Sequence, residues 1–230
     1  MLVYQCRLKV FILKDTPVNE IQSKLTAFID KGFSTNEELL RRHEERGYTG
    51  YCFDYLYPLE KDKVYHKDKI YTLTIRTVDP AMARYFNEIC VNNFTEDIKG
   101  LTSEIKVLPK KRIETLYSLT PALIKTENGY WKKQMTIQQY MERLRINLIK
   151  KWNYFENDRL NEDFEFCNLF EFLNHGPIPV PYKGIILLGD KIRMEISDDK
   201  TAQRLAYMCL GTGILENNGR GAGFVNYRWL

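Results

Sequence analysis

His43 has the most basic surroundings of the three histidines in this sequence, because Arg41, Arg42 and Arg46 lie close to it. Nearby positive charge disfavours the imidazolium form, which leaves a neutral imidazole near neutral pH. A neutral imidazole can accept the proton of a ribose 2′-hydroxyl, and its conjugate acid can protonate a leaving oxygen. The residue types therefore permit His43 to act as a general acid and base, although for a lone histidine the commoner role is structural. The alternative interpretation is an ordinary residue on the surface of a helix.

A glycine-rich segment occupies positions 211–223 and holds five of the 13 glycines of the chain. Such density is typical of backbone that takes positive φ or approaches another group closely. Successive backbone N–H groups in such a loop can hold an anion. In a basic, aromatic-rich protein we expect that anion to be nucleic acid, although a purely structural loop is the alternative. The predicted RNA-binding residues in this segment are Gly211, Gly213, Asn218, Gly219, Arg220, Gly221 and Gly223.

Two nucleotide-binding motifs do not fit this segment. The Lys-Ser or Lys-Thr pair of a P-loop does not follow its last glycine, which argues against ATP hydrolysis. The segment is also expected to follow a helix and precede a strand, the reverse of the order in a dinucleotide-binding fold. We therefore predict no nucleotide cofactor.

Basic residues also form three short clusters, at 110–112, 132–133 and 150–151. Each cluster alone is typical of a solvated face, but together they can follow a phosphate backbone. Among them, Lys110, Lys111 and Arg112 are predicted to hold RNA. The net charge of +4, with 15 tyrosines and 12 phenylalanines, permits an RNA partner without requiring one.

The cysteines and histidines exclude several other classes of protein. The five cysteines are an odd number and form no C-x-x-C pair, so neither a disulfide framework nor a structural zinc site is expected. We predict reduced thiols in a cytoplasmic protein with no metal or other cofactor. The first residues do not resemble a signal peptide, and no stretch approaches the length of a membrane span.

The first half of the chain alternates between strand-like and helix-like patterns. Strands are expected at 2–12, 51–57, 71–75 and 104–108, with the second and third antiparallel. A helix is expected from an N-cap at Thr16-Pro17 to Gly32. A short second helix is expected from the capping box at 34–37, and another helix after Asp79-Pro80. This order is that of a ferredoxin-like, or RRM-like, domain.

The second half repeats this order less clearly. We expect a strand at 113–125, a helix with an apolar stripe at 137–152, and a hairpin of 185–188 with 192–196. A helix capped by Asp198 or Asp199, the glycine-rich segment and a last strand at 224–229 follow. Residues 153–183 are interpreted as an insertion or a long connection. The predicted fold is α+β, with two tandem ferredoxin-like domains at 1–112 and 113–230.

The combination of tandem ferredoxin-like halves, a histidine soon after the first long helix and a C-terminal G-x-G-x₅-G-x-G segment resembles the Cas-six endoribonucleases of the RAMP superfamily. The aromatic strand at 50–54 adds to the resemblance. It covers nearly the whole chain. It implies metal-independent cleavage within a CRISPR repeat, by attack of a 2′-hydroxyl on the adjacent phosphate, which leaves a 2′,3′-cyclic phosphate and a 5′-hydroxyl.

The resemblance assigns the general acid and base position to His43. Some members pair the histidine with a tyrosine on the first helix and a lysine before the aromatic strand, where this chain has Phe28 and Thr49. Assistance is then expected from Arg42, Arg46 or Tyr48. The implied partner is CRISPR repeat RNA, for a monomer or homodimer not bound to membranes. A non-catalytic RAMP subunit that binds RNA with other CRISPR effector subunits is the alternative, as is a generic RRM-type module.

Overall fold

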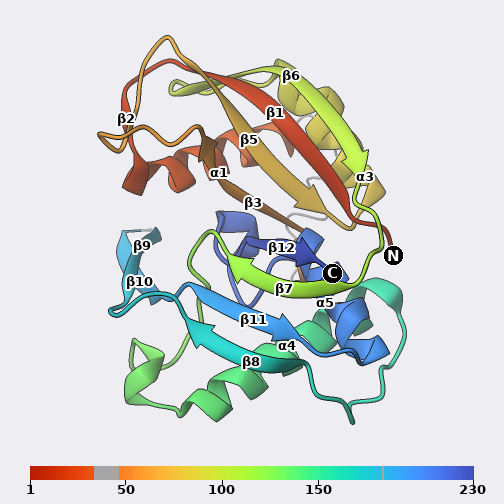
Figure 1. The fold of residues 1–230 in the computed structure, drawn as a ribbon. Coiled ribbons are helices and arrows are strands. Elements are labelled where there is room, and N and C mark those ends of the chain that lie inside the picture. The colour runs from red at the N-terminus through yellow and green to blue at the C-terminus, as the bar shows by residue number, and fades with distance from the viewer. Residues whose placement is uncertain (34–46, 183) are drawn as a thin grey trace.

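The structure, a computed structural model, describes residues 1–33, 47–182 and 184–230. Two four-stranded antiparallel sheets dominate it (Figure 1). The first sheet has the order β3-β5-β1-β6, and the second has the order β12-β7-β11-β8. Each sheet comes from one β-α-β-β-α-β unit. In each, the first strand of the unit (β1 or β7) lies beside the last one (β6 or β12). The predicted α+β fold with two tandem ferredoxin-like halves is therefore confirmed.

The first sheet contains β1 (Tyr4–Ile12), β3 (Tyr51–Tyr57), β5 (Ile70–Thr77) and β6 (Ile98–Val107). Its helices are α1 (Val18–Phe33) and α3 (Pro80–Arg84), the second continued by a π-helical turn, Tyr85–Ile89, and a 3₁₀ turn, Cys90–Asn92. The Asp79 side chain caps α3, as its position before Pro80 predicts. The predicted second helix, after residue 33, lies outside the described residues.

The entry to α1 differs from the prediction. Thr16–Pro17 form a short strand, β2, which pairs with β4 (Val64–Tyr65), so they do not cap the helix. At the other end Gly32 lies inside α1 and does not end it. The hydroxyl of Tyr85 fills the space that a side chain at Gly32 would need. A glycine is therefore needed at position 32 because α1 packs against the continuation of α3, a contact that the sequence does not reveal.

The second sheet contains β7 (Ile113–Ser118), β8 (Cys167–Phe172), β11 (Ile192–Ile196) and β12 (Val225–Trp229). Its helices are α4 (Ile137–Glu156), which begins with a capping box of Thr136 and Gln139, and α5 (Lys200–Thr212), capped by Asp199. Short 3₁₀ turns lie at Trp131–Lys133 and Asn218–Arg220. The segment between residues 107 and 113, where we placed the domain boundary, connects β6 to β7.

Three predictions for the second half were wrong. Residues 153–183 are not an insertion, because they supply β8, an edge strand of the sheet. The strand predicted at 113–125 ends at Ser118. The predicted hairpin does not form, because β10 (Ile185–Gly189) pairs with β9 (Ile178–Tyr182) while β11 pairs with β7 and β8. Asp190, expected in the turn, is fully buried and accepts hydrogen bonds from side chains of Tyr130, Trp131 and Asn174.

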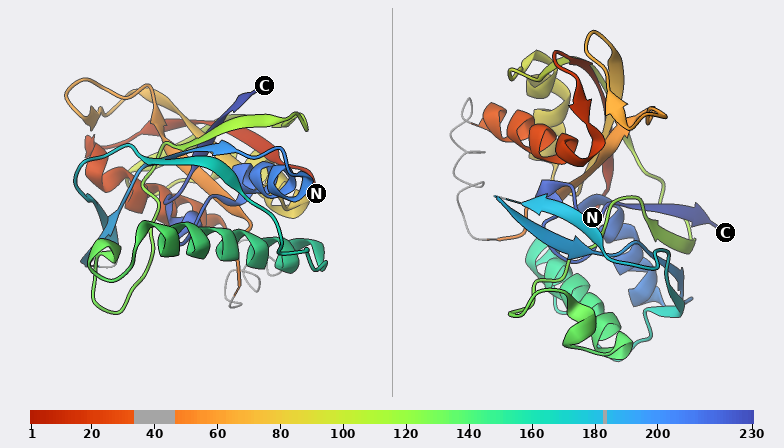
Figure 2. Two further views of the ribbon diagram at one scale, coloured as in Figure 1. Left: turned by 60° about the horizontal axis from the view of Figure 1, so that its bottom comes forward. Right: turned by 90° about the vertical axis from the view of Figure 1, so that its left-hand side faces the viewer.

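Each half has its own hydrophobic core, between a sheet and the helices that cover one of its faces (Figures 1 and 2). Arg76 of β5 joins the two halves. Its buried guanidinium donates to the Gln5 side chain in β1 and to the backbone oxygen of Val225 in β12, at 2.9 and 2.7 Å. It also lies over the ring of Phe224, 4.7 Å from the ring centroid. This contact fixes the end of the glycine-rich segment against the first half.

Candidate functional site

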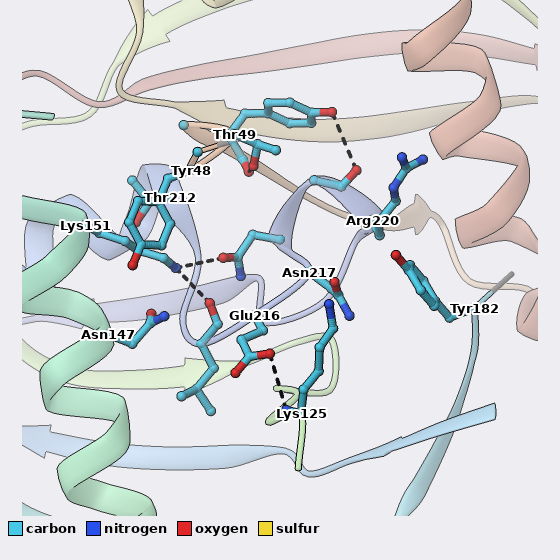
Figure 3. Close-up of a pocket in the computed structure, with 16 residues that line it drawn as sticks. Tyr48, Thr49, Lys125, Asn147, Lys151, Tyr182, Thr212, Glu216, Asn217 and Arg220 are labelled. Carbon is cyan, nitrogen blue, oxygen red and sulfur yellow. Dashed lines mark hydrogen bonds between the residues drawn. The ribbon is translucent and has the colours of Figure 1, made fainter. Parts of the chain in front are cut away.

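A pocket of about 280 Å³ lies where the two halves meet (Figure 3). The first half contributes residues 47–51, which lead into β3. The second half contributes Asn147 and Lys151 of α4, Lys125, Tyr182 of β9 and the segment 212–220. The glycine-rich segment and residues 47–51, which follow His43 in the sequence, therefore line one cavity. We call this cavity the junction pocket.

Lys151 holds the glycine-rich segment from inside the protein. Its side chain is 1% exposed, and its ammonium donates to the backbone oxygens of Gly213 and Leu215 and to Oδ1 of Asn218, at 2.8, 3.0 and 2.7 Å. Figure 3 draws the last two of these bonds. Three acceptors match the three N–H groups of an ammonium. Burial lowers the pKa of Lys151 to about 7. The Lys150-Lys151 cluster is thus not a solvated face, because one of its two cations supports the loop.

The backbone conformation of the segment favours glycine at positions 221 and 223. Gly221 has a φ of 83°, and a Cβ there would lie 2.0 Å from Oε1 of Gln22 in α1. Gly223 has a φ of 66°, and a Cβ there would lie 2.1 Å from the backbone oxygen of Ile214. The positive φ favours glycine at both positions, and at Gly223 a backbone oxygen also blocks a side chain, whereas the Gln22 side chain can move. The segment therefore folds back on itself and touches the first half of the chain.

Many polar groups of the segment bond within the protein. The N–H groups of Gly213, Gly221 and Gly223 donate to backbone oxygens, at 2.8, 3.0 and 2.8 Å. The buried amide of Asn218 donates to Ile214 and Ala222 and accepts from Lys151. These residues shape the junction pocket, and their N–H groups are engaged as the structure stands.

The other predicted glycines lie at contacts between the halves. Gly211 sits in α5 directly against the backbone of β5, where a Cβ would lie 3.1 Å from the carbonyl carbon of Thr77. Gly219 faces Thr49, whose Cγ2 would lie 3.0 Å from such a Cβ. Both glycines therefore let the second half approach the first closely at the edge of the junction pocket.

Positive charge in the junction pocket comes from Arg220, Lys125 and Lys151. Arg220 forms an ion pair with Asp30 of α1, at 2.7 Å, and its side chain is 36% exposed. The ammonium of Lys125 lies 5.7 Å from the centroid of the Tyr182 ring. Glu216 also lines the pocket, but its carboxylate is paired with Arg143 at 3.1 Å. Lys125, unlike Arg220, has no carboxylate partner in the described part of the chain, and its charge favours an anion.

Two uncharged polar groups of the pocket have no hydrogen-bond partner in the described part of the chain. They are Nδ2 of Asn217 and Oδ1 of Asn147, both buried atoms of residues that line the cavity. Buried polar groups are ordinarily paired. Both atoms are shielded from solvent, so a ligand in the junction pocket reaches them only if the two side chains turn.

Of the four predicted catalytic residues, the structure describes Tyr48. Its ring packs edge-on against Tyr154 with 5.6 Å between the centroids, it lines the pocket, and burial raises its pKa. His43, Arg42 and Arg46 lie outside the described residues. Phe28, at the position where some Cas-six members have a tyrosine, is fully buried in the first core and cannot reach the pocket. Thr49 lines the pocket.

The predicted RNA-binding residues Lys110, Lys111 and Arg112 lie elsewhere. They line a second, larger cavity that shares no lining residue with the junction pocket. The structure therefore divides the predicted RNA-binding set between two places. Sequence reasoning missed Lys125, Asn147, Tyr182 and Asn217. It also placed Lys151 away from the apolar stripe, although Lys151 follows Leu148 by three residues, which puts both on one helix face.

Among the described residues, no group of three or more His, Cys, Asp or Glu side chains is placed to hold a metal ion. None of the helices described is both long and apolar enough to cross a membrane.

No protein-family model and no curated protein matches the sequence. The fold, however, is that of the Cas6 and RAMP proteins, so the predicted resemblance in fold is confirmed. A "CRISPR associated protein Cas6" has 20% sequence identity and a TM-score of 0.67, over 98% of this chain and 99% of that one. "An RAMP protein binding different RNA substrates" has 17% identity and a TM-score of 0.72, over 98% and 99%. A Cas6-related protein of Pyrococcus furiosus has 18% identity and a TM-score of 0.68, over 98% of both chains.

Proposed function

We propose that this chain is a Cas6-family endoribonuclease that cleaves CRISPR precursor RNA within the repeat. The observation that carries the proposal is the junction pocket. There the glycine-rich segment meets residues 47–51, which follow His43 in the sequence. The fold shared with Cas6 proteins along almost the whole chain supports it. A Cas6 protein described as a product complex also has this fold, with 15% identity and a TM-score of 0.67.

The proposed reaction is a transesterification at phosphorus. The 2′-oxygen attacks the adjacent phosphate, a new bond to phosphorus forms, and the bond to the 5′-oxygen breaks. His43 takes the proton of the 2′-hydroxyl or gives one to the departing 5′-oxygen, and the products are a 2′,3′-cyclic phosphate and a 5′-hydroxyl. Alignment of the three reacting atoms by the bound RNA supplies much of the rate. The chemistry needs no metal ion.

Cations of the chain stabilise the additional negative charge of the transition state in this scheme. Arg42 and Arg46, which are close to His43 in the sequence, are the proposed donors, and Tyr48 is a further one. Lys125 and Arg220 are further donors, since both line the junction pocket. Arginine suits the role because it stays charged and presents a fixed fork of N–H groups.

The test is cleavage of the cognate repeat RNA in EDTA. We expect a cut at one position that leaves a cyclic phosphate, and His43→Ala should slow it by about 10²–10⁴-fold. His175→Ala is the matched control, because His175 is an exposed loop residue outside the pocket. Cleavage by His43→Ala at the parent rate would remove His43 from the mechanism.

A second candidate function is RNA binding without cleavage, in a CRISPR effector complex. The burial of Phe28 and the uncharged Thr49 favour it, because some Cas-six members have tyrosine and lysine at these positions. In this case the parent protein would bind the repeat RNA tightly and leave it intact in the same assay.

A further inference from the structure

A second cavity, of about 690 Å³, lies beside the segment that connects the two halves. We call it the linker cavity. Its walls are the connecting residues 110–112, the C-terminal part of α4 and the first two turns of α5. Its volume is within the range of ligand-binding sites, about 300–1,000 Å³.

The linker cavity is strongly basic. Its lining includes five basic side chains, those of Lys110, Lys111, Arg112, Lys200 and Arg204. Arg112 is paired with Asp198, whereas the other four form no ion pair within 4.0 Å in the described part of the chain. Lys110 lies over the ring of Tyr207, 5.9 Å from the centroid, and this contact leaves its charge uncompensated.

Two more carboxylates line the linker cavity. Glu156 pairs with the N-terminal amine at 3.1 Å. Of the carboxylates that line the cavity, the exposed Asp158 is then the one with no ion pair in the described part of the chain. Four uncompensated cations against one uncompensated carboxylate make a site for an anion with more than one charge.

Trp152 adds an unsatisfied donor to this cavity. The residue is 8% exposed and lines the cavity, and its indole N–H has no acceptor in the described structure. An indole nitrogen can only donate, and buried donors ordinarily have a partner. Because the indole nitrogen itself is shielded from solvent, a phosphate oxygen in the cavity reaches it only if the Trp152 side chain turns on binding.

We propose that the linker cavity is a second RNA site, which holds phosphate groups of the strand at a distance from the junction pocket. This inference rests on the proposed function, because RNA supplies the phosphates. The two cavities lie on different faces of α4: Lys151 supports the junction pocket, while the next residue, Trp152, lines the linker cavity. One RNA strand that passes the C-terminal part of α4 can therefore occupy both.

The first experiment measures binding of a 2′-O-methyl repeat RNA, which cannot be cut, by fluorescence anisotropy at several salt concentrations. Lys200→Gln with Arg204→Gln should weaken binding by roughly tenfold and reduce the slope of log affinity against log salt by about 1.4, or 0.7 for each lost phosphate contact. The control removes the same charge elsewhere: Lys61→Gln with Lys67→Gln, two exposed lysines between β3 and β5. Equal affinities and slopes for the two double variants would overturn the proposal.

The second experiment identifies the ligand by tryptophan fluorescence. Inorganic phosphate should change the emission of the parent protein but not of Trp152→Phe, and saturating repeat RNA should abolish this response. A phosphate response that RNA leaves unchanged would assign the cavity to a free phosphate compound and overturn the RNA assignment. Displacement of phosphate by polyglutamate but not by RNA would assign it to an acidic protein and equally overturn it.

The outcomes separate this inference from the proposed function. A parent protein that binds no repeat RNA refutes both. A parent that binds and cleaves it, with a linker-cavity variant indistinguishable from its control, refutes the second RNA site and leaves the nuclease assignment standing.

Discussion

Individual buried charges hold this protein together where the two halves meet. Lys151 and Arg76 are both nearly inaccessible to solvent, and each donates to backbone oxygens. A buried cation is tolerated only when its N–H groups are paired. These two residues therefore stabilise one arrangement of the segment 211–225.

The half-buried carboxylate of Asp54, which feels the charge of Arg76, predicts a pH dependence. Burial raises the pKa of Asp54 in β3 to about 6 from 3.8. Between these values the folded protein carries a proton on Asp54 that the unfolded chain lacks. The contribution of Asp54 to stability is thus full below about pH 4 and is lost as the pH rises through 6.

The size of this effect follows from the shift, at ~1.4 kcal/mol for each pKa unit, which gives at most roughly 3 kcal/mol. Asp54→Asn should remove this part of the pH dependence. The measurement is the free energy of unfolding in urea from pH 4 to pH 7, with the exposed Asp163→Asn as control. If the curves of parent and Asp54→Asn run parallel, Asp54 does not titrate in this way.

At the scale of elements, the glycine-rich segment is a rigid connection between α5 and β12. A positive φ and a close contact are two separate reasons for glycine at a position. Comparison of two glycines distinguishes the two reasons. Gly223 has a φ of 66° and a backbone oxygen in the way of a Cβ, whereas Gly129 has a φ of 94° and nothing within 4 Å.

This pair gives a prediction with its own control. Gly129→Ala should lose ~1–2 kcal/mol of stability, the cost of a left-handed alanine. Gly223→Ala should lose at least ~2 kcal/mol more, because the oxygen of Ile214 must move as well. Urea unfolding of both variants measures the difference. Equal losses would show that the close contact at Gly223 relaxes without cost.

Sequence reasoning succeeded for elements with local signals. Alternation predicts β1, and the capping residues Asp79 and Asp199 mark their helices by side-chain bonds to nearby N–H groups. It failed where distant residues decide. Asp190 is buried because Tyr130, Trp131 and Asn174 supply donors, and Lys151 because the glycine-rich segment supplies acceptors. The glycine-rich segment could be singled out from the sequence, but the side chains that form the junction pocket with it meet only through the fold.

At the scale of the whole molecule, Arg76 connects the two sheets. Its replacement by Met should lose ~3–5 kcal/mol of stability, because buried acceptors lose their partner and the stack on Phe224 is weakened. We expect the two halves of Arg76→Met to unfold in separate steps, visible by calorimetry.

The matched control for this substitution is Arg228→Met. Arg228 lies in β12, the strand that also supplies the Val225 acceptor of Arg76. Its ion pair with Glu114, however, is exposed, with side-chain exposures of 61% and 39%. Such pairs contribute ~1 kcal/mol or less. A similar loss of stability for both arginine variants would contradict the role of Arg76.

The walls of the junction pocket belong to different halves of the chain, since Gly50 and Thr49 come from one and Lys151 and Asn218 from the other. A small rotation between the halves therefore changes the width of the pocket directly. Mild substitutions at that interface, unlike the loss of Arg76, are expected to alter the proposed cleavage of RNA before they measurably alter the melting temperature. Activity would then report domain alignment more sensitively than any measurement of stability.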